Sequence, residues 1–163
     1  MTDVTKSQTM KSSKAEMAPT KSERRKNADR SASTRKQILE ATVRCLDAWG
    51  YGSVTNIRVA DEAGVSRGAM MHHFPTRQAL IMATVEFANS KLTEFRSKEI
   101  EQLPEGLARY RAFIDLALVT QRMPEGMACN EVRIGSRSDP EIRAAVTPIM
   151  SQISDDYGRT ISR

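Results

Sequence analysis

The fold of this chain is decided by the stretch Gly64-Val65-Ser66-Arg67-Gly68-Ala69-Met70-Met71-His72-His73-Phe74-Pro75. Glycine readily takes the positive φ that ends a helix, and a serine two residues later can cap the next helix with its hydroxyl. Proline cannot continue a helix, so Pro75 ends that second helix after a few residues. The stretch therefore predicts two short helices that are joined by a tight glycine turn.

The residues before Gly64 complete this unit. Thr55 is placed to cap the first short helix, and Val54 can pack on it as a hydrophobic staple. Ala60 is small enough to let the two helices approach closely. We expect a small core between the helices from Val59, Ala63, Val65 and Met70. This pattern predicts a helix-turn-helix at 55–74, which would place the start of its second helix in the major groove of DNA. The spacing alone also fits a helical hairpin with a glycine cap.

A longer helix precedes the helix-turn-helix. Ile38, Thr42, Cys45 and Trp49 recur at helical spacing, and the cluster Gly50-Tyr51-Gly52 ends the pattern. Residues 1–33 are rich in Ser, Thr, Lys and Ala and carry no apolar stripe. We therefore interpret residues 1–33 as a disordered basic arm.

The remaining residues show only helical periodicity, so the predicted fold class is all-α. Thr76 is placed to cap a long helix, which Leu103-Pro104 ends, and another helix follows from Leu107. Pro124 to Gly126 predicts a further break before a helix at 127–135. Asp139-Pro140 then begins a last helix, whose apolar stripe reaches Ile161. That stripe needs cover, so either a second subunit supplies it or the chain is C-terminally truncated.

Composition and charge favour a cytoplasmic protein with an acidic partner. No segment has the roughly 18 apolar residues of a membrane span. Cys45 and Cys129 are isolated, which suits reduced thiols and gives no metal-binding spacing. Of the net charge of +5, residues 1–33 carry +4, residues 34–80 carry +2 and the rest carry −1. Nucleic acid would therefore meet the first half, although a basic tail can also serve only solubility.

The segment 64–80 resembles the TetR/AcrR repressor family, whose members typically read AGVSxGxxYxHFxxKxxL there. The opening of the first helix, 35–41, also resembles the family, and residues 131–143 do so more weakly. The resemblance is strong over 34–85 and weak over 86–163. It implies an N-terminal helix-turn-helix domain at 34–80, followed by a helical ligand and dimerisation domain at 81–163 that we expect to be incomplete.

Carried over by position, the resemblance assigns DNA contacts. It places Thr55 and Thr76 at helix N-termini that hold phosphates, and Arg77 on a phosphate where the family has Lys. Arg67 could contact a guanine or a phosphate, whereas Gly68 and Ala69 keep the helix close to the groove floor. Ala69 and Met71 depart from the family's frequent Thr and Tyr, which changes the base readout. The full predicted set is Arg35, Lys36, Thr55, Arg58, Ser66, Arg67, Gly68, Ala69, Met71, His72, Thr76 and Arg77.

The resemblance implies a homodimeric repressor that binds double-stranded operator DNA and releases it when a small-molecule effector binds. Tyr110, Phe113, Leu116, Met123 and Met127 are the predicted effector-binding residues, and ordinary core packing is the alternative for each. A ligand-independent DNA-binding or interaction module is the alternative function. The chain has no glycine-rich phosphate loop and no nucleophile–base pair, so we expect neither an enzyme nor a cofactor.

Overall fold

The computed structural model describes residues 20–103 and 106–161, with the side chains of the last helix described as far as Ile153. Within these residues the chain is helical and contains no strand, which confirms the all-α prediction. The helices are α1 (Lys21–Trp49), α2 (Asn56–Ala63), α3 (Arg67–His73), α4 (Arg77–Glu101), α5 (Leu107–Gln121), α6 (Pro124–Gly135) and α7 (Pro140–Ile161). Two 3-10 turns, η1 (Tyr51–Ser53) and η2 (Ser136–Ser138), follow α1 and α6.

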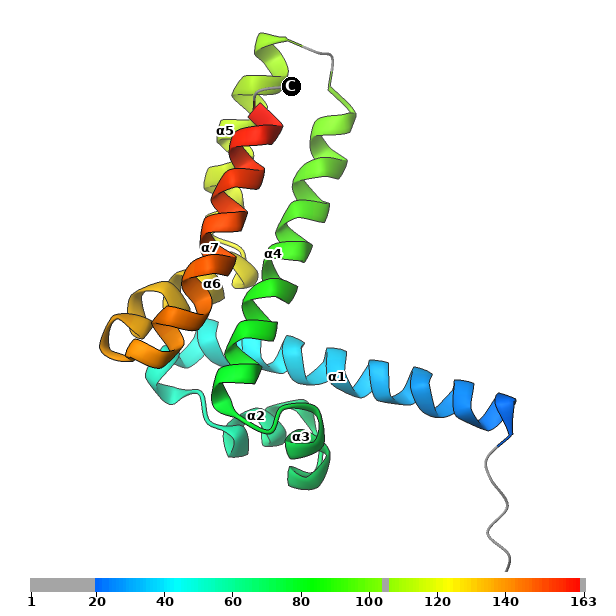
Figure 1. The fold of residues 1–163 in the computed structure, drawn as a ribbon. Helices are drawn as coiled ribbons and strands as arrows, with labels where there is room; N and C mark the ends of the chain where they lie inside the picture. The colour runs from blue at the N-terminus through cyan, green and yellow to red at the C-terminus, as the bar shows by residue number, and fades with distance from the viewer. Residues whose placement is uncertain (1–19, 104–105, 162–163) are drawn as a thin grey trace, which may run out of the picture.

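The helices form a small head and an upright body (Figure 1). Helices α2 and α3 lie at one end of the molecule, and α1 passes above them and packs against α2, α4 and α6. Helix α4 rises from the head and packs against α5, α6 and α7. Because α4 runs without a break through the boundary predicted at residues 80 and 81, the head and the body share one helix.

The local signals that were predicted to begin and end the helices are present. Gly50 and Gly64 have φ values of +72° and +65°, which an L side chain would adopt only with strain. The hydroxyls of Thr55, Ser66 and Thr76 accept hydrogen bonds from the backbone N–H groups three residues later, at 3.2, 3.1 and 3.0 Å. The caps fix where α2, α3 and α4 begin.

Two predictions about helix starts are wrong. Residues 21–33 belong to α1 and are not disordered, whereas residues 1–19 lie outside the described part of the chain. Thr20 and Glu23 form a capping box, and Lys, Arg and Ala favour helix once the packed part of α1 has formed. Helix α6 begins at Pro124 instead of Met127, because proline suits the first position of a helix.

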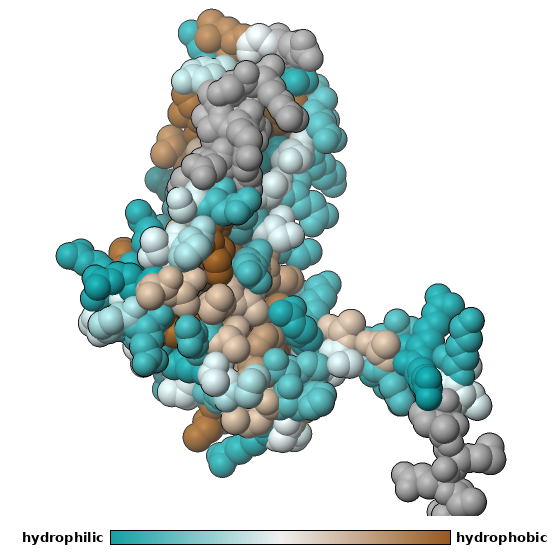
Figure 2. Space-filling view, viewed as in Figure 1, coloured by the Kyte–Doolittle hydropathy of each residue, from teal (hydrophilic) through white to brown (hydrophobic). Residues whose placement is uncertain are grey.

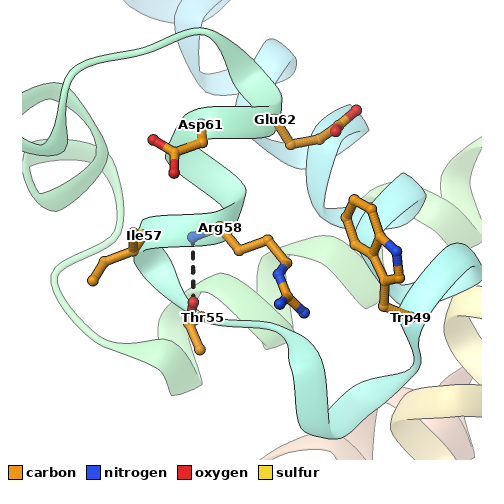
Figure 3. Close-up of a pocket in the computed structure, with 6 residues that line it drawn as sticks. All are labelled: Trp49, Thr55, Ile57, Arg58, Asp61 and Glu62. Atoms are coloured by element: carbon orange, nitrogen blue, oxygen red, sulfur yellow. Dashed lines mark hydrogen bonds between the residues drawn. The ribbon is translucent and has the colours of Figure 1, made fainter.

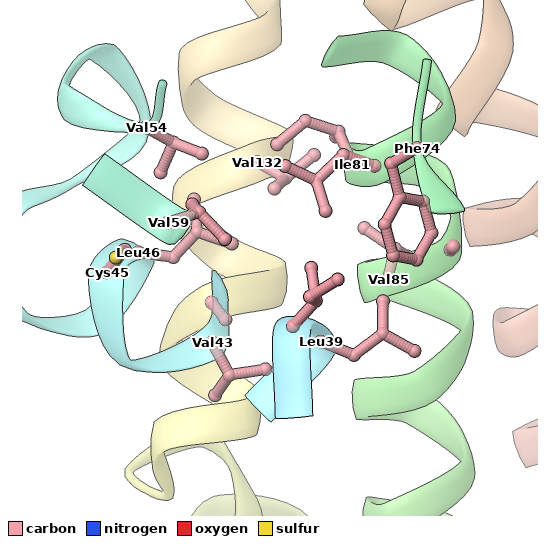
Figure 4. Packing of buried hydrophobic residues seen from close by; sticks show 14 of the residues in the cluster. Leu39, Val43, Cys45, Leu46, Val54, Val59, Phe74, Ile81, Val85 and Val132 are labelled. Atoms are coloured by element: carbon pink, nitrogen blue, oxygen red, sulfur yellow. The ribbon is translucent and has the colours of Figure 1, made fainter. Parts of the chain in front are cut away.

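One continuous core joins the head to the body (Figure 4). Ile38 and Leu46 of α1 contribute to it, with Val59 of α2 and Met70 of α3 from the head. From the body, α4, α6 and α7 supply Leu80, Ile81, Val85, Val132, Ile142 and Val146. Trp49 departs from the predicted stripe of α1, since half of its surface is exposed. The shared core means that the head is not a separately packed unit.

Helix α5 packs on α4 and α6 but presents an apolar outer face. Leu107, Tyr110, Ile114 and Leu118 recur at helical spacing on that face, and all four are exposed. Among the described helices none is both long and apolar enough to cross a membrane. The described residues also contain no group of three or more His, Cys, Asp or Glu that could hold a metal ion.

Candidate nucleic-acid interface

The turn between α2 and α3 has the close packing that a helix-turn-helix requires. Gly64 donates its N–H to Asp61 and Val65 donates to Ala60, at 3.2 and 3.0 Å, so the backbone reverses within two residues. Ala60 is buried, as are Met70 and, just after α3, Phe74. Helix α3 is therefore held by its inner face and leaves its other face to solvent.

The outer face of α3 is slender, basic and partly apolar. Arg67, Gly68, Met71 and His72 are exposed, and Ala69 is half-buried. The nearest atom to a Cβ added at Gly68 would be the Ser66 Oγ, at 3.9 Å, so open space lies in front of this residue. The α3 face, defined as residues 66–69, 71 and 72, could approach another surface closely.

Asn56 is a residue of this surface that the sequence analysis missed. It is the first residue of α2, and its Nδ2 donates to the sulfur of Met71 at 3.4 Å. This contact orients Met71, which stands where the resemblance expects Tyr. No local signal reveals it, because it joins two helices across the turn.

The start of α2 forms a second part of the interface. Thr55, Ile57, Arg58 and Trp49 line an open hollow of about 580 Å³, together with Asp61 and Glu62 (Figure 3). The Arg58 guanidinium lies 5.2 Å from the Trp49 ring centroid, and its Nη1 donates to the Ser53 carbonyl at 3.1 Å. Arg58 is exposed, so its remaining N–H groups can meet an anion. Sequence reasoning missed Trp49 and Ile57, because apolar periodicity assigns such residues to the core.

Helix α1 brings positive charge toward α3. The Arg35 guanidinium lies 5.2 Å from the centroid of the Phe74 ring, at the end of α3. Lys36 is exposed and pairs with Glu40 at 3.7 Å. Further along, Lys21, Arg24, Arg25, Lys26 and Arg30 outnumber Glu23 and Asp29. This part of α1 projects from the body with a mainly hydrophilic surface (Figure 2).

The imidazoles after Met71 differ in their surroundings. His73 is half-buried, and burial first, then the neighbouring His72 and Arg35, lower its pKa. His73 is therefore neutral at neutral pH and belongs with the packing around Phe74, whose ring centroid is 6.5 Å away. His72 is exposed on the α3 face.

Arg77, for which the resemblance implies a phosphate contact, makes several hydrogen bonds within the protein. Its guanidinium turns inward and donates to the carbonyls of Val54 and Tyr51, at 3.2 and 3.1 Å. It also donates to the Tyr51 hydroxyl at 2.7 Å and pairs with Asp139 at 3.3 Å. Tyr51, Val54 and Asp139 lie far from Arg77 in sequence, so the sequence analysis missed these contacts, and the phosphate contact of Arg77 stays a prediction.

The body contains a hollow. This partly open hollow of about 280 Å³ lies between α4, α6 and α7 at the end of α5, and it is lined by Asn89, Leu92, Gln121, Gly126, Cys129, Asn130, Arg133, Met150 and Ile153. None of the five predicted effector residues lines it. Tyr110 and Met127 are exposed, Phe113 is buried, and Leu116 and Met123 are half-buried elsewhere on α5 and before α6. Burial raises the pKa of Cys129 to about 11, so this thiol stays protonated.

Comparison with known proteins identifies the head. Residues 38–84 match the family described as bacterial regulatory proteins, tetR family. The head of this chain is therefore a domain of the TetR family. One TetR-family relative, the transcriptional regulator CymR of Pseudomonas putida, is 39% identical over 71 residues, which are 44% of this chain and 35% of CymR. The transcriptional repressor Rv1474c of Mycobacterium tuberculosis is 35% identical over 71 residues, covering 44% of this chain and 38% of that protein.

The fold of the body also has a solved counterpart. A transcriptional regulator from Saccharomonospora viridis, in complex with choline, superposes with a TM-score of 0.66 and 22% identity over 80% of this chain and 67% of that one. This likeness confirms the prediction of an N-terminal helix-turn-helix followed by a helical domain. The chain spans less than two fifths of the length of the two curated TetR-family relatives.

Proposed function

We propose that this protein is a sequence-specific DNA-binding transcriptional regulator that acts as a repressor. The observation that carries the proposal is the α3 face, where Arg67, Gly68 and His72 stand exposed on a helix that is held firmly from behind. Helix-turn-helix proteins insert such a face into the major groove. The two curated relatives are named as a transcriptional regulator and a repressor, and neither is named as an enzyme.

The surrounding groups divide into base and phosphate contacts. Arg67, Ala69 and Met71 lie on α3, where they could reach base edges. Thr55 and Thr76 begin α2 and α4, and helix N-termini attract phosphates. Arg58, Arg35 and Lys36 flank α3 with positive charge. Phosphate contacts would fix the register, and the slender α3 face would read the sequence.

A homodimer and a cytoplasmic location are part of the same proposal. A single head reads one half-site, and a two-fold dimer presents two heads about 34 Å apart, which matches one turn of DNA. We propose that residues 34–80 form the DNA-binding domain and that the following helices form the regulatory and dimerisation domain. When bound to its operator, the protein would be associated with the nucleoid.

Arg67→Ala is expected to weaken binding to the selected DNA sequence by about 1–3 kcal/mol if Arg67 reads a base. The measurement is a titration of a duplex that the wild-type protein has selected from a random-sequence pool, beside a scrambled duplex. Arg111→Ala removes an exposed arginine from α5 and serves as the matched control. An equal loss on both duplexes would assign Arg67 to a phosphate. Failure to select any sequence would overturn the proposed function.

We further propose that a small molecule binds in the hollow between α4, α6 and α7 and lowers operator affinity. The hollow combines amide and guanidinium groups from Asn89, Gln121, Asn130 and Arg133 with apolar side chains. Gln121 and Asn130 already share a hydrogen bond of 2.7 Å, so the hollow is partly organised. The Saccharomonospora relative of the same fold holds choline.

A compound that fills this hollow is expected to raise the melting temperature, since a ligand at 100 times its Kd adds about 2.7 kcal/mol of stability. A thermal-shift screen of small amphipathic molecules measures this effect. Asn89→Trp, which fills the hollow from α4, should abolish the shift but leave DNA binding. An operator affinity that none of the binding compounds changes would instead favour a ligand-independent DNA-binding module.

A further inference from the structure

In addition to the shared core, one tyrosine and its polar partners connect the head to the body. We name the group of Tyr51, Arg77, Glu131 and Asp139 the Tyr51 clasp. Tyr51 is buried, and the Arg77 guanidinium covers its ring at 4.2 Å from the centroid. A Cβ at Gly135 would overlap the same ring, so α6 lies directly against it. The Tyr51 N–H donates to the Glu131 carboxylate at 3.1 Å.

The hydrogen bonds of the clasp form a consistent chain. Because Arg77 donates to the Tyr51 oxygen, the hydroxyl proton is free to point to Asp139 Oδ2, at 3.0 Å. The other Asp139 oxygen accepts the N–H of Ile142 at 3.2 Å and caps α7. That N–H first, then Tyr51 and Arg77, lower the pKa of Asp139, whereas burial raises the pKa of Tyr51. At neutral pH the clasp therefore holds a neutral phenol, a carboxylate and a guanidinium.

The clasp fixes the segment that leads directly into α2. Two Arg77 nitrogens hold the carbonyls of Tyr51 and Val54, and Val54 immediately precedes the Thr55 cap of α2. Arg77 itself is the first residue of α4. Besides the apolar core, one guanidinium and one phenol ring thus help to set the position of α2 relative to α4, α6 and α7.

The same clasp reaches the hollow in the body. Glu131 lies on α6 between Asn130 and Arg133, and both neighbours line that hollow. A displacement of α6 would move Glu131 and Gly135, which hold the backbone and the ring of Tyr51. The clasp is therefore a physical connection between the hollow and the start of α2.

We propose that Arg77 is a positioning residue for DNA reading, which acts through Tyr51 and Asp139 to set the angle of the head, and that it contacts no phosphate. This inference rests on the proposed function, since it concerns how the α3 face is presented to DNA. It differs from the phosphate contact that the resemblance implies for Arg77, which stands where the family has Lys. The two roles predict opposite effects for the removal of the Asp139 charge.

Asp139→Asn is the decisive variant. Asparagine still caps α7, so the helix start is kept while the carboxylate is lost. If Arg77 positions the head, the affinity for the selected duplex should fall by at least about 5-fold, the low end of typical coupling between sites. If Arg77 contacts phosphate, losing a negative charge should leave the affinity unchanged or increase it, and this result would overturn the proposal.

Arg77→Lys provides a second test, because lysine keeps the charge but cannot hold Val54, Tyr51 and Asp139 together. The positioning role predicts weaker binding with an unchanged slope of log affinity against log salt. A phosphate contact would survive in Arg77→Lys, and Arg77→Ala would lower the slope by roughly 1. Asp115→Asn removes an exposed carboxylate of α5 and is the matched control for the charge change.

A measurement without DNA separates this inference from the proposed function. Hydrogen exchange of the amides in 51–60 should become faster in Asp139→Asn and in Arg77→Lys, while the amides of α5 keep their protection. Unchanged exchange at 51–60 in both variants would refute the clasp even if DNA binding is demonstrated. Faster exchange at 51–60 in a protein that selects no DNA sequence would support the Tyr51 clasp. It would overturn the proposed function as a DNA-binding regulator.

Discussion

Gly126→Ala is expected to destabilise the protein by about 1–3 kcal/mol, although it adds only one methyl group. Gly126 lies buried in the first turn of α6, directly against the end of α5. A Cβ there would overlap the carbonyl oxygen of Thr120 and lie 3.0 Å from the Cα of Gln121. Both neighbours are backbone atoms, so no side chain can rotate away, and α5 and α6 would have to separate.

Urea unfolding followed by circular dichroism measures this loss. Gly68→Ala is the matched control, because a Cβ at Gly68 meets open space. Replacing a helical glycine with alanine there should stabilise the protein by roughly 0.5–1 kcal/mol. Equal stability of Gly126→Ala and the wild type would show that the connection between α5 and α6 is not packed as described.

The local features of the head could be predicted because their causes are local. Thr55, Ser66 and Thr76 are hydroxyl residues that precede helices, and each caps the helix that follows it. Gly64 takes the left-handed conformation because only glycine does so cheaply. Such signals need no knowledge of the rest of the chain, so they placed the helix-turn-helix correctly.

The features that could not be predicted from the sequence depend on tertiary contacts or on the absence of such contacts. An apolar stripe reports packing, so its absence over 21–33 wrongly indicated disorder in a helix that projects into solvent. The resemblance assigns Arg77 to a phosphate because the family has Lys there, whereas the contact with Asp139 joins residues 62 positions apart in sequence. No spacing rule links the two residues. The five predicted effector residues do not line the hollow beside α4, α6 and α7, and periodicity does not separate core residues from those that line a hollow.

The largest functional effect is expected from Gly68→Leu. Gly68 lies near the start of α3, where its missing side chain lets the backbone approach a groove floor. A leucine would hold α3 away from the base edges, and each good contact to a base pair contributes about 1–3 kcal/mol of discrimination. With two heads in the proposed dimer, affinity for the selected duplex should fall at least about 30-fold, the equivalent of two such contacts at about 1 kcal/mol each.

The distinguishing result is a loss of specificity without a loss of fold. Affinity for a scrambled duplex should change little, because Arg35, Lys36 and Arg58 would still meet phosphates. Gly68→Ala should stay within a few fold of the wild type, since a methyl group is small enough for close approach. Ala108→Leu adds the same kind of side chain to the exposed face of α5 and should leave DNA binding unchanged. If Gly68→Leu still discriminates the selected duplex as the wild type does, α3 is not the element that reads the groove, and the reading surface must lie at the start of α2 beside Trp49 and Arg58.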